Sequence, residues 1–458
     1  MLKPASMLRL PKYLPGLFMF ALFVECSAAN GLIKILAAAE HEGSPNSHQD
    51  SSRRLEESAG EPAVGSPIAR LQERLAAGGT LRWDDSRGYL QDLLVKLDID
   101  PDSQSLVFSK TSFQPRRIDP QHPRAIYFND MTYVGWVQGS DLIELCEADP
   151  IEGAVFFTLE PEVTAGVPQR KPILTRQGIR CLGCHDSVRT QGVPGFLMRS
   201  LVPNTEGRFV RGGPTYVTNH DSPFDERFGG WYVTGTHGQM RHLGNTVYSE
   251  HQWVGEFDHE SGANRVDLPA QVVSDAYLRP GSDLMALMVL AHETQMHNAF
   301  AQVTAASHRL VTDEFGAEAG FTRSVEKLVR SLLFADEPQL QSPIAGSTGY
   351  AKAFAARGPI DGLGRSLRQF DAEKYLFRYP CSFLIHSQAF AGLSPLVKEA
   401  VGRRLREILV EAAVVDPPFK RPIVEEREAV AAILSETEAD FWKRYVVGMN
   451  DKEELPAR

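Results

Sequence analysis

Cysteine is scarce in this sequence, basic residues are outnumbered by acidic ones, and no glycine-rich phosphate loop or dinucleotide fingerprint occurs. Five cysteines in 458 residues are too few for a disulfide scaffold, so an apolar core must hold the fold together. The formal net charge of −10 argues against nucleic acid or an anionic membrane surface as a partner, because both need a basic face. A small-molecule substrate or a partner protein is therefore expected.

Long apolar runs are also missing after the first residues. Three basic residues precede the apolar run 14–24, and the small residues Ala28 and Ala29 follow it. This order is typical of a secretory signal peptide, and we expect cleavage near residues 28–29. A lipid anchor through Cys26 and an uncleaved anchor are the less favoured alternatives. No later window is long enough to span a bilayer, so the sequence predicts a periplasmic or otherwise exported chain without an integral membrane span once processed.

The remaining chain changes character several times. We expect 1–29 as signal peptide, 30–65 as a flexible tether rich in Ser, Glu, Gly and Pro, 66–165 as a β-rich domain, 166–310 as a middle segment, and 311–458 as a helical domain. The fold class is thus α+β, with a loop-rich middle. Predicted helices cover 67–77, 89–97, 283–310 (capped by Ser282), 322–334, 360–370, 396–412 and 425–434, and predicted strands cover 125–128, 133–137, 142–146 and 154–159.

The middle segment contains the pentapeptide Cys181-Leu182-Gly183-Cys184-His185, which is the attachment motif of c-type haem. Its spacing presents both thiols to the two vinyl groups of the porphyrin, and the adjacent histidine reaches the iron as proximal ligand. A redox dithiol or half a zinc site is the competing interpretation. A zinc site needs a second ligand pair, which the chain lacks, and a redox pair needs no histidine. We therefore expect one covalent haem c, bound through Cys181 and Cys184 with His185 on the iron, and we interpret 166–310 as a haem-binding cytochrome c-like segment.

The sixth iron ligand decides what such a haem does. In the predicted helix 283–310, Met285, Met288, His292 and Met296 share one face. Methionines there are expected to be core residues, whereas His292 or His297 could reach the iron. His292-Glu293 is not a zinc-protease motif, because Met296 stands where the second histidine would be.

Three further histidines lie in a stretch rich in glycine and aromatic residues: His220, His237 and His242. Each alone is most simply a hydrogen-bonding residue that organises loops, but as a group they suit a haem pocket. Of these we retain His242 as a third candidate distal ligand. Further candidates in this stretch are Met198 and Met240 for the iron, and Arg199, Arg227 and Arg241 for the haem propionates.

Cys146 and Cys381 lie far apart in the sequence. Export permits a disulfide between them, and two separate buried thiols are the equal alternative, because pairing depends on their distance in space.

With these residues in view, most of the mature chain resembles a family of exported bacterial proteins that carry a single cytochrome c-type haem motif. The resemblance rests on the haem motif and on the segments 106–111, 124–130, 192–196, 229–238, 292–298 and 379–382. It implies a haem protein with an electron-transfer role. Relatives of this kind often have His-Met-Gly-Asn where this chain has His242-Leu243-Gly244-Asn245, so a methionine ligand at that place is not expected here.

The functional expectation is therefore an exported c-type haem protein that carries out electron transfer, alone or coupled to oxidoreduction of a small substrate at the haem. If it is an enzyme, it is a haem oxidoreductase. The alternative is a haem-based binding or sensing module without turnover, and a third interpretation is a dithiol protein without haem. The extent of chain around the motif favours the first, since a simple shuttle needs only a small helical domain.

Overall fold

The computed structural model describes residues 65–163, 170–412, 418–421 and 423–448. The predicted signal peptide and tether therefore lie outside the described residues. The fold is α+β, as the sequence predicts, with an antiparallel sheet in the N-terminal part and helices in the C-terminal part.

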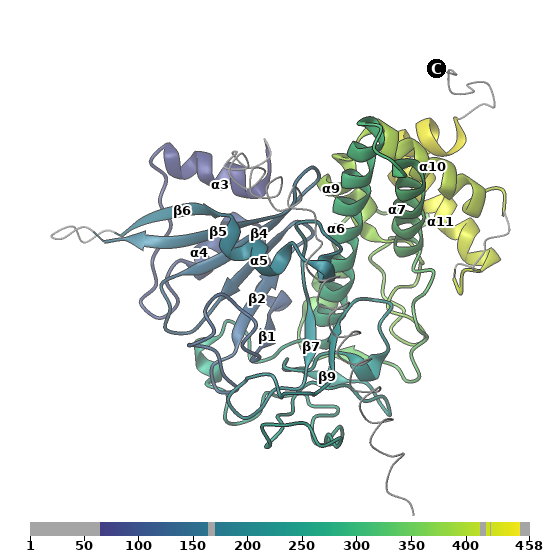
Figure 1. The fold of residues 1–458 in the computed structure, drawn as a ribbon. Coiled ribbons are helices and arrows are strands. Elements are labelled where there is room, and N and C mark those ends of the chain that lie inside the picture. The colour runs from purple at the N-terminus through teal and green to yellow at the C-terminus, as the bar shows by residue number, and fades with distance from the viewer. Residues whose placement is uncertain (1–64, 164–169, 413–417, 422, 449–458) are drawn as a thin grey trace, which may run out of the picture. The chain divides into compact units, whose positions relative to one another are not determined.

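The sheet has six strands, and strands that follow one another in the chain are neighbours in the sheet (Figure 1). They are β1 (Ser105–Val107), β2 (Arg124–Phe128), β3 (Thr132–Trp136), β4 (Ile143–Asp149), β5 (Gly153–Glu162) and β6 (Lys171–Gln177). The four inner strands were predicted. The two edge strands were missed, because β1 has only three residues and β6 carries mostly exposed or half-buried side chains, so neither shows a clear apolar alternation.

Each face of the sheet packs on different helices, because successive side chains of a strand point to opposite faces. One face, with Tyr127, Val134 and Leu145, shares a core with α3 (Pro67–Ala76) and α4 (Leu90–Lys96). The other face packs against the long helix α6 (Leu284–Val311). Phe128, Tyr133, Cys146 and Phe156 stand in one register row on this second face.

Between the sheet and α6, the chain contains only short elements, as expected for the loop-rich segment. They are α5 (Ile179–His185), η2 (Val188–Thr190), β7 (Arg199–Leu201), β8 (Thr215–Val217), η3 (Phe224–Glu226), β9 (Gly235–Thr236) and η4 (Ser274–Ala276), and η1 (Pro101–Ser103) precedes the sheet. The haem motif itself forms α5, which the sequence did not predict as a helix.

The sequence predicted Ser282 as the N-cap of α6, but the structure shows Asp283 in this position. The Asp283 carboxylate accepts hydrogen bonds from the amides of Met285 and Ala286. Ser282 is used elsewhere: its hydroxyl donates to the carbonyl of Tyr232 and accepts from the amide of Leu106. A side chain with two carboxylate oxygens can satisfy more amides at a helix start than a single hydroxyl.

Helices form most of the C-terminal part, and Figure 1 shows α7 running alongside α6 with α10 and α11 next to them. The elements are α7 (Ala317–Leu332), β10 (Ala345–Gly346), α8 (Tyr350–Ala355), η5 (Phe383–His386), α9 (Gln388–Ala391), α10 (Pro395–Leu409), α11 (Val424–Thr437), α12 (Ala439–Phe441) and the π-helical turn η6 (Trp442–Val447). Among the described residues, no helix has both the length and the apolar character that crossing a bilayer requires.

The helix predicted at 360–370 is wrong, because these residues form turns. The Asp361 carboxylate accepts from the amides of Leu363 and Arg365, which holds the chain in a turn. Ile360 and Leu363 are 66% and 78% exposed. The apolar residues of this stretch therefore do not form a buried helix face.

Candidate functional site: the Cys181–His185 helix

The haem motif forms a short helix directly after the last strand of the sheet. The carbonyl of Gly178 accepts hydrogen bonds from the amides of Cys181 and Leu182, which starts α5. Residues three apart in a helix lie on the same side, so Cys181 and Cys184 are neighbours. Cys181 is half-buried, Cys184 is exposed, and both thiols are free. Two unbonded thiols one helical turn apart are what attachment to a porphyrin requires.

The proton position on His185 is fixed by its surroundings. Its Nδ1 lies 2.8 Å from the carbonyl oxygen of Gly195. A carbonyl only accepts, so Nδ1 carries the proton and Nε2 keeps a lone pair. The Phe156 ring lies 4.6 Å from the imidazole, and burial lowers the pKa of His185, which keeps the ring neutral. A neutral imidazole held through Nδ1 on a carbonyl is ready to bind a metal through Nε2.

Further hydrogen bonds hold the carbonyl of Gly195 in place. The amide of Gly195 donates back to the His185 carbonyl. Asn298 of α6 accepts from the amide of Phe196 through Oδ1 and donates to its carbonyl through Nδ2, at 2.7 and 2.8 Å. A Cβ on Gly195 would lie 2.5 Å from Asn298 Oδ1, so glycine is required. Neither Gly195 nor Asn298 was proposed from the sequence, although both lie in the segments 192–196 and 292–298 that carry the family resemblance.

His292 lies far from solvent in a chain of side-chain hydrogen bonds. Its Nδ1 is 2.9 Å from Nδ1 of His220, and its Nε2 is 2.7 Å from the Ser382 hydroxyl. His220 Nε2 lies 3.1 Å from an Asp221 oxygen. Both nitrogens of His292 are therefore engaged, and binding iron would break one of these bonds inside the core.

His242 carries its proton on Nε2, whereas His185 carries its proton on Nδ1. The Nδ1 of His242 accepts a hydrogen bond from the amide of Gly244 at 3.0 Å, so the proton sits on Nε2, which has no lone pair to give to iron. The neighbouring His237 uses both nitrogens, one toward the Met240 carbonyl and one toward the Asn264 amide. His237 and His242 therefore organise a loop. This was the simpler interpretation of these histidines from the sequence, with a haem pocket as the other.

His297 is buried, and neither of its ring nitrogens has a hydrogen-bond partner. Its ring packs against Phe196 and Tyr133, with centroids 5.4 and 6.0 Å apart. Phe196 directly follows Gly195, whose carbonyl accepts from His185, so a chain of contacts links His297 to the motif. Within the described residues, no hydrogen bond or ring contact joins it, His292 or His242 to His185 itself.

The arginines named as candidates for the haem propionates differ in how far they are already bonded to other residues. Arg227 is buried and donates to the carbonyls of His220 and Ser222, and Arg241 forms two hydrogen bonds with Glu260. Arg199 donates to Thr215 through one nitrogen, while its Nε has no partner. The candidate methionines are all core residues: Met198, Met240, Met285, Met288 and Met296.

Cys146 and Cys381 are both buried and both free, so the structure has two separate thiols and no disulfide between them. Cys146 lies in the sheet row that ends at Phe156, beneath α5. Burial raises its pKa well above the ordinary value, and the nearby Cys181 thiol acts in the same direction. A thiol that stays protonated is a poor nucleophile.

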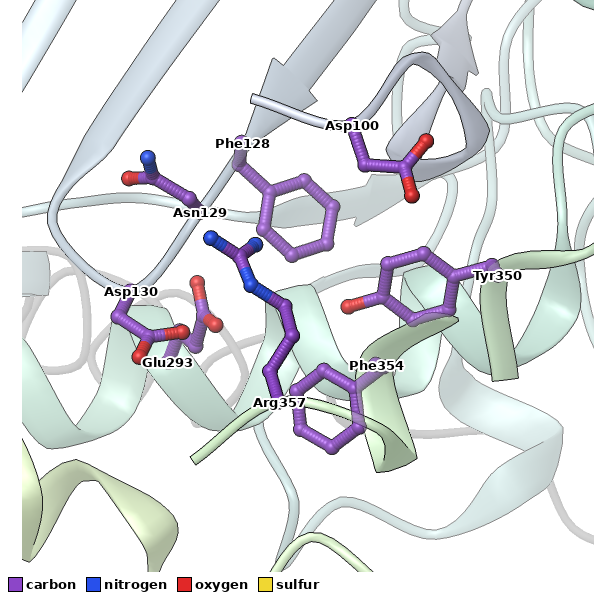
Figure 2. A pocket seen from close by; sticks show the side chains of 8 residues that line it. All are labelled: Asp100, Phe128, Asn129, Asp130, Glu293, Tyr350, Phe354 and Arg357. Carbon is purple, nitrogen blue, oxygen red and sulfur yellow. The ribbon is translucent and has the colours of Figure 1, made fainter. Parts of the chain in front are cut away.

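A second feature was not foreseen from the sequence: a cavity of about 20 Å³ between the sheet, α6 and α8. Figure 2 shows the carboxylates of Asp130 and Glu293 side by side, with Arg357 between them and Tyr350. Burial and the charge of Asp130 raise the pKa of Glu293 well above its usual range, and its carboxyl accepts from the Tyr133 hydroxyl at 3.3 Å. The volume suits one water molecule. Glu293 escaped notice because its neighbours follow an apolar helical pattern.

Comparison with known protein families, curated proteins and solved structures gives no match. Among the described residues, no group of three or more His, Cys, Asp or Glu side chains could hold a metal ion by itself. The two free thiols and the Nδ1-protonated His185 are the side chains that a covalently attached haem would need.

The buried histidines predict a marked loss of stability in acid. Burial is the main reason that the pKa of His242 and of His297 falls to about 3, against 6.5 in an unfolded chain. Below pH 6.5 the unfolded state binds protons that the folded state does not, so this contribution is complete above pH 6.5 and declines toward pH 3. We expect His242→Asn, which retains an acceptor for Gly244, to reduce the slope of unfolding free energy against pH by about 1 kcal/mol per pH unit.

Urea unfolding at pH 7, 6 and 5 measures this slope. His251 is exposed, so His251→Asn is the matched control and should leave the slope as in the wild type. Equal slopes for His242→Asn and the wild type would contradict the assignment of a buried neutral imidazole.

Proposed function

We propose that this chain is an exported protein that binds one haem c through Cys181 and Cys184 and transfers electrons, alone or coupled to oxidoreduction of a small substrate. The observation that carries the proposal is the hydrogen bond from His185 Nδ1 to Gly195, beside the two free thiols. This bond gives His185 the tautomer that ligates iron, whereas the bonds of His242 and His292 oppose ligation. Export supports it, since the predicted signal peptide directs the chain to the compartment where this haem is attached.

Each residue near the motif has a defined part in this proposal. Cys181 and Cys184 would hold the porphyrin by thioether bonds, and His185 would be the proximal ligand. Gly195 and Asn298 are positioning residues, since they act through His185. When bound, the haem supplies an iron that takes up and gives back one electron.

A sensing module without turnover is the second candidate, and one observation favours it. The hydrogen bonds of His292 and His242 oppose ligation by either side chain, so the iron would have a position open to a small ligand unless His297 fills it. An open position also suits an oxidoreductase, whereas a pure carrier needs a strong sixth ligand.

The absorption spectrum of the purified protein, oxidised and reduced, with and without carbon monoxide, tests the proposal. We expect c-type haem bands that shift when carbon monoxide is added to the reduced protein. An unchanged spectrum would show a strong sixth ligand, and His297→Phe should then restore the shift if His297 supplies it. Protein without haem bands would refute the proposal.

Turnover separates the two candidates. A reduced protein that binds carbon monoxide and passes its electron to an acceptor, and that a donor then reduces again, is a redox protein. Binding without any turnover favours the sensing module.

A further inference from the structure

The segment that carries the haem motif is basic, although the chain as a whole is acidic. Residues 170–200 contain six arginine and lysine side chains and one aspartate, in a chain of formal net charge −10. Charge of one sign that gathers on one segment of an oppositely charged chain sets a local field, and this field can guide a partner to that place.

The six basic side chains are of two kinds. Three have a carboxylate within 4 Å: Arg170 with Asp141, Lys171 with Glu162, and Arg176 with Glu152. The other three are Arg180, Arg189 and Arg199, and in the part of the chain that the structure describes none of these has a carboxylate at that distance. The unpaired charges are thus the ones nearest the motif.

Arg180 lies within α5, and its guanidinium stacks over the ring of Phe113 at 4.4 Å. Phe113 therefore holds a positive charge at the surface without neutralising it. Arg180 is exposed, as are Gly183 and Cys184 of the same helix. Its charge also acts on the Cys181 thiol, which places it within electrostatic reach of the first attachment residue.

Arg189 and Arg199 follow the motif in the chain. Arg189 is exposed, whereas Arg199 is half-buried in β7, and its Nε has no hydrogen-bond partner. Burial and the charge of Arg189 lower the pKa of Arg199, so an anion that binds beside Arg199 would offset both effects. Glu144, the carboxylate with the largest effect on Cys181, is already paired with Arg124 at 2.8 Å, so it does not supply that anion.

We propose that Arg180, Arg189 and Arg199 form the docking surface for an acidic redox partner protein, centred on the exposed Cys184. The inference rests on the proposed function, because the surface surrounds the edge at which the haem would be attached. Arg180 directly precedes Cys181 in the chain and Arg189 follows His185 by four residues, and both side chains are exposed, so they remain available to a partner. Electron-transfer encounters are small and brief, and charge complementarity mainly speeds association.

The first test measures binding and does not depend on electron transfer. A fluorescently labelled polyglutamate peptide stands in for an acidic protein surface, and its anisotropy is followed with the full-length processed protein at low ionic strength. The triple variant Arg180→Gln, Arg189→Gln and Arg199→Gln is expected to bind the peptide about tenfold more weakly. The control replaces three exposed arginines of α6, α7 and α10, Arg309, Arg323 and Arg403, by glutamine. This control loses the same charge and should bind within about twofold of wild type.

The second test uses hexacyanoferrate(III), an anion that takes one electron from ferrous haem and becomes hexacyanoferrate(II), with no proton transferred. If the net charge governed the encounter, rising salt would speed this reaction, because an acidic protein repels the anion. The docking surface predicts the opposite: rising salt slows it, and the triple variant loses this dependence while the control keeps it.

The outcomes distinguish this inference from the proposed function. A protein with haem whose two triple variants behave alike in both tests would overturn the docking surface alone. A protein without haem refutes the proposed function, and peptide binding then still reports on the arginines. Flotation with phosphatidylglycerol vesicles, lost in the docking-surface variant, together with no peptide binding, would assign the surface to a membrane and overturn the inference.

Discussion

Replacing both Cys181 and Cys184 by serine is expected to abolish haem staining on a denaturing gel and to leave an unmodified polypeptide. Thioether bonds survive denaturation, whereas a haem held only by His185 is lost when the chain unfolds. Both thiols are free, and the helix that holds them has no fully buried residue. The fold should therefore tolerate the exchange, and circular dichroism should match that of the wild type.

The matched control is Cys381→Ala. Cys381 is buried and free, and burial raises its pKa far above the ordinary value, so it stays a protonated thiol. This variant should stain as strongly as the wild type. Staining that persists in the double serine variant, or that disappears in Cys381→Ala, would contradict the assignment of Cys181 and Cys184.

Asp283→Ala is expected to lower the free energy of unfolding by on the order of 4 kcal/mol. The Asp283 side chain is fully buried and accepts five hydrogen bonds. Two come from the first turn of α6, and three come from the amides of Ser347 and Thr348 and the Thr348 hydroxyl, each at 2.8 Å. Alanine leaves all five donors without this acceptor. The two amides of α6 are buried, and each buried unsatisfied donor is costly.

Two comparisons make this prediction specific. Asp283→Asn keeps one acceptor oxygen and should cost less than alanine. Ser394→Ala removes an N-cap that accepts from only one amide, that of Val397, and should cost about 1 kcal/mol. Urea unfolding measures all three. An alanine variant at Asp283 as stable as Ser394→Ala would show that the five bonds do not hold α6 as described.

Local sequence patterns predicted the elements that depend on periodicity and capping. Proline after Ser66 starts α3, and the Ser66 hydroxyl accepts from the amide of Ala69 as a cap should. The alternating strands β2 to β5 and the long helix α6 follow from the spacing of apolar residues. The haem motif was found because its chemistry is contained in five consecutive residues.

Long-range pairings could not be predicted in this way, because no local pattern records them. Asn298 forms two hydrogen bonds with the backbone of Phe196, 102 positions away in the sequence, and His292 meets both His220 and Ser382 inside the core. The tautomer of each histidine depends on these partners. For this reason the sequence could name His292, His297 and His242 as candidates but could not distinguish their free nitrogens from engaged ones.

The mass of the intact protein, secreted by a host that matures c-type cytochromes, tests the central claim most directly. We expect the mass of the processed polypeptide plus one haem, in coloured protein. A colourless protein with the mass of the bare processed polypeptide would contradict it.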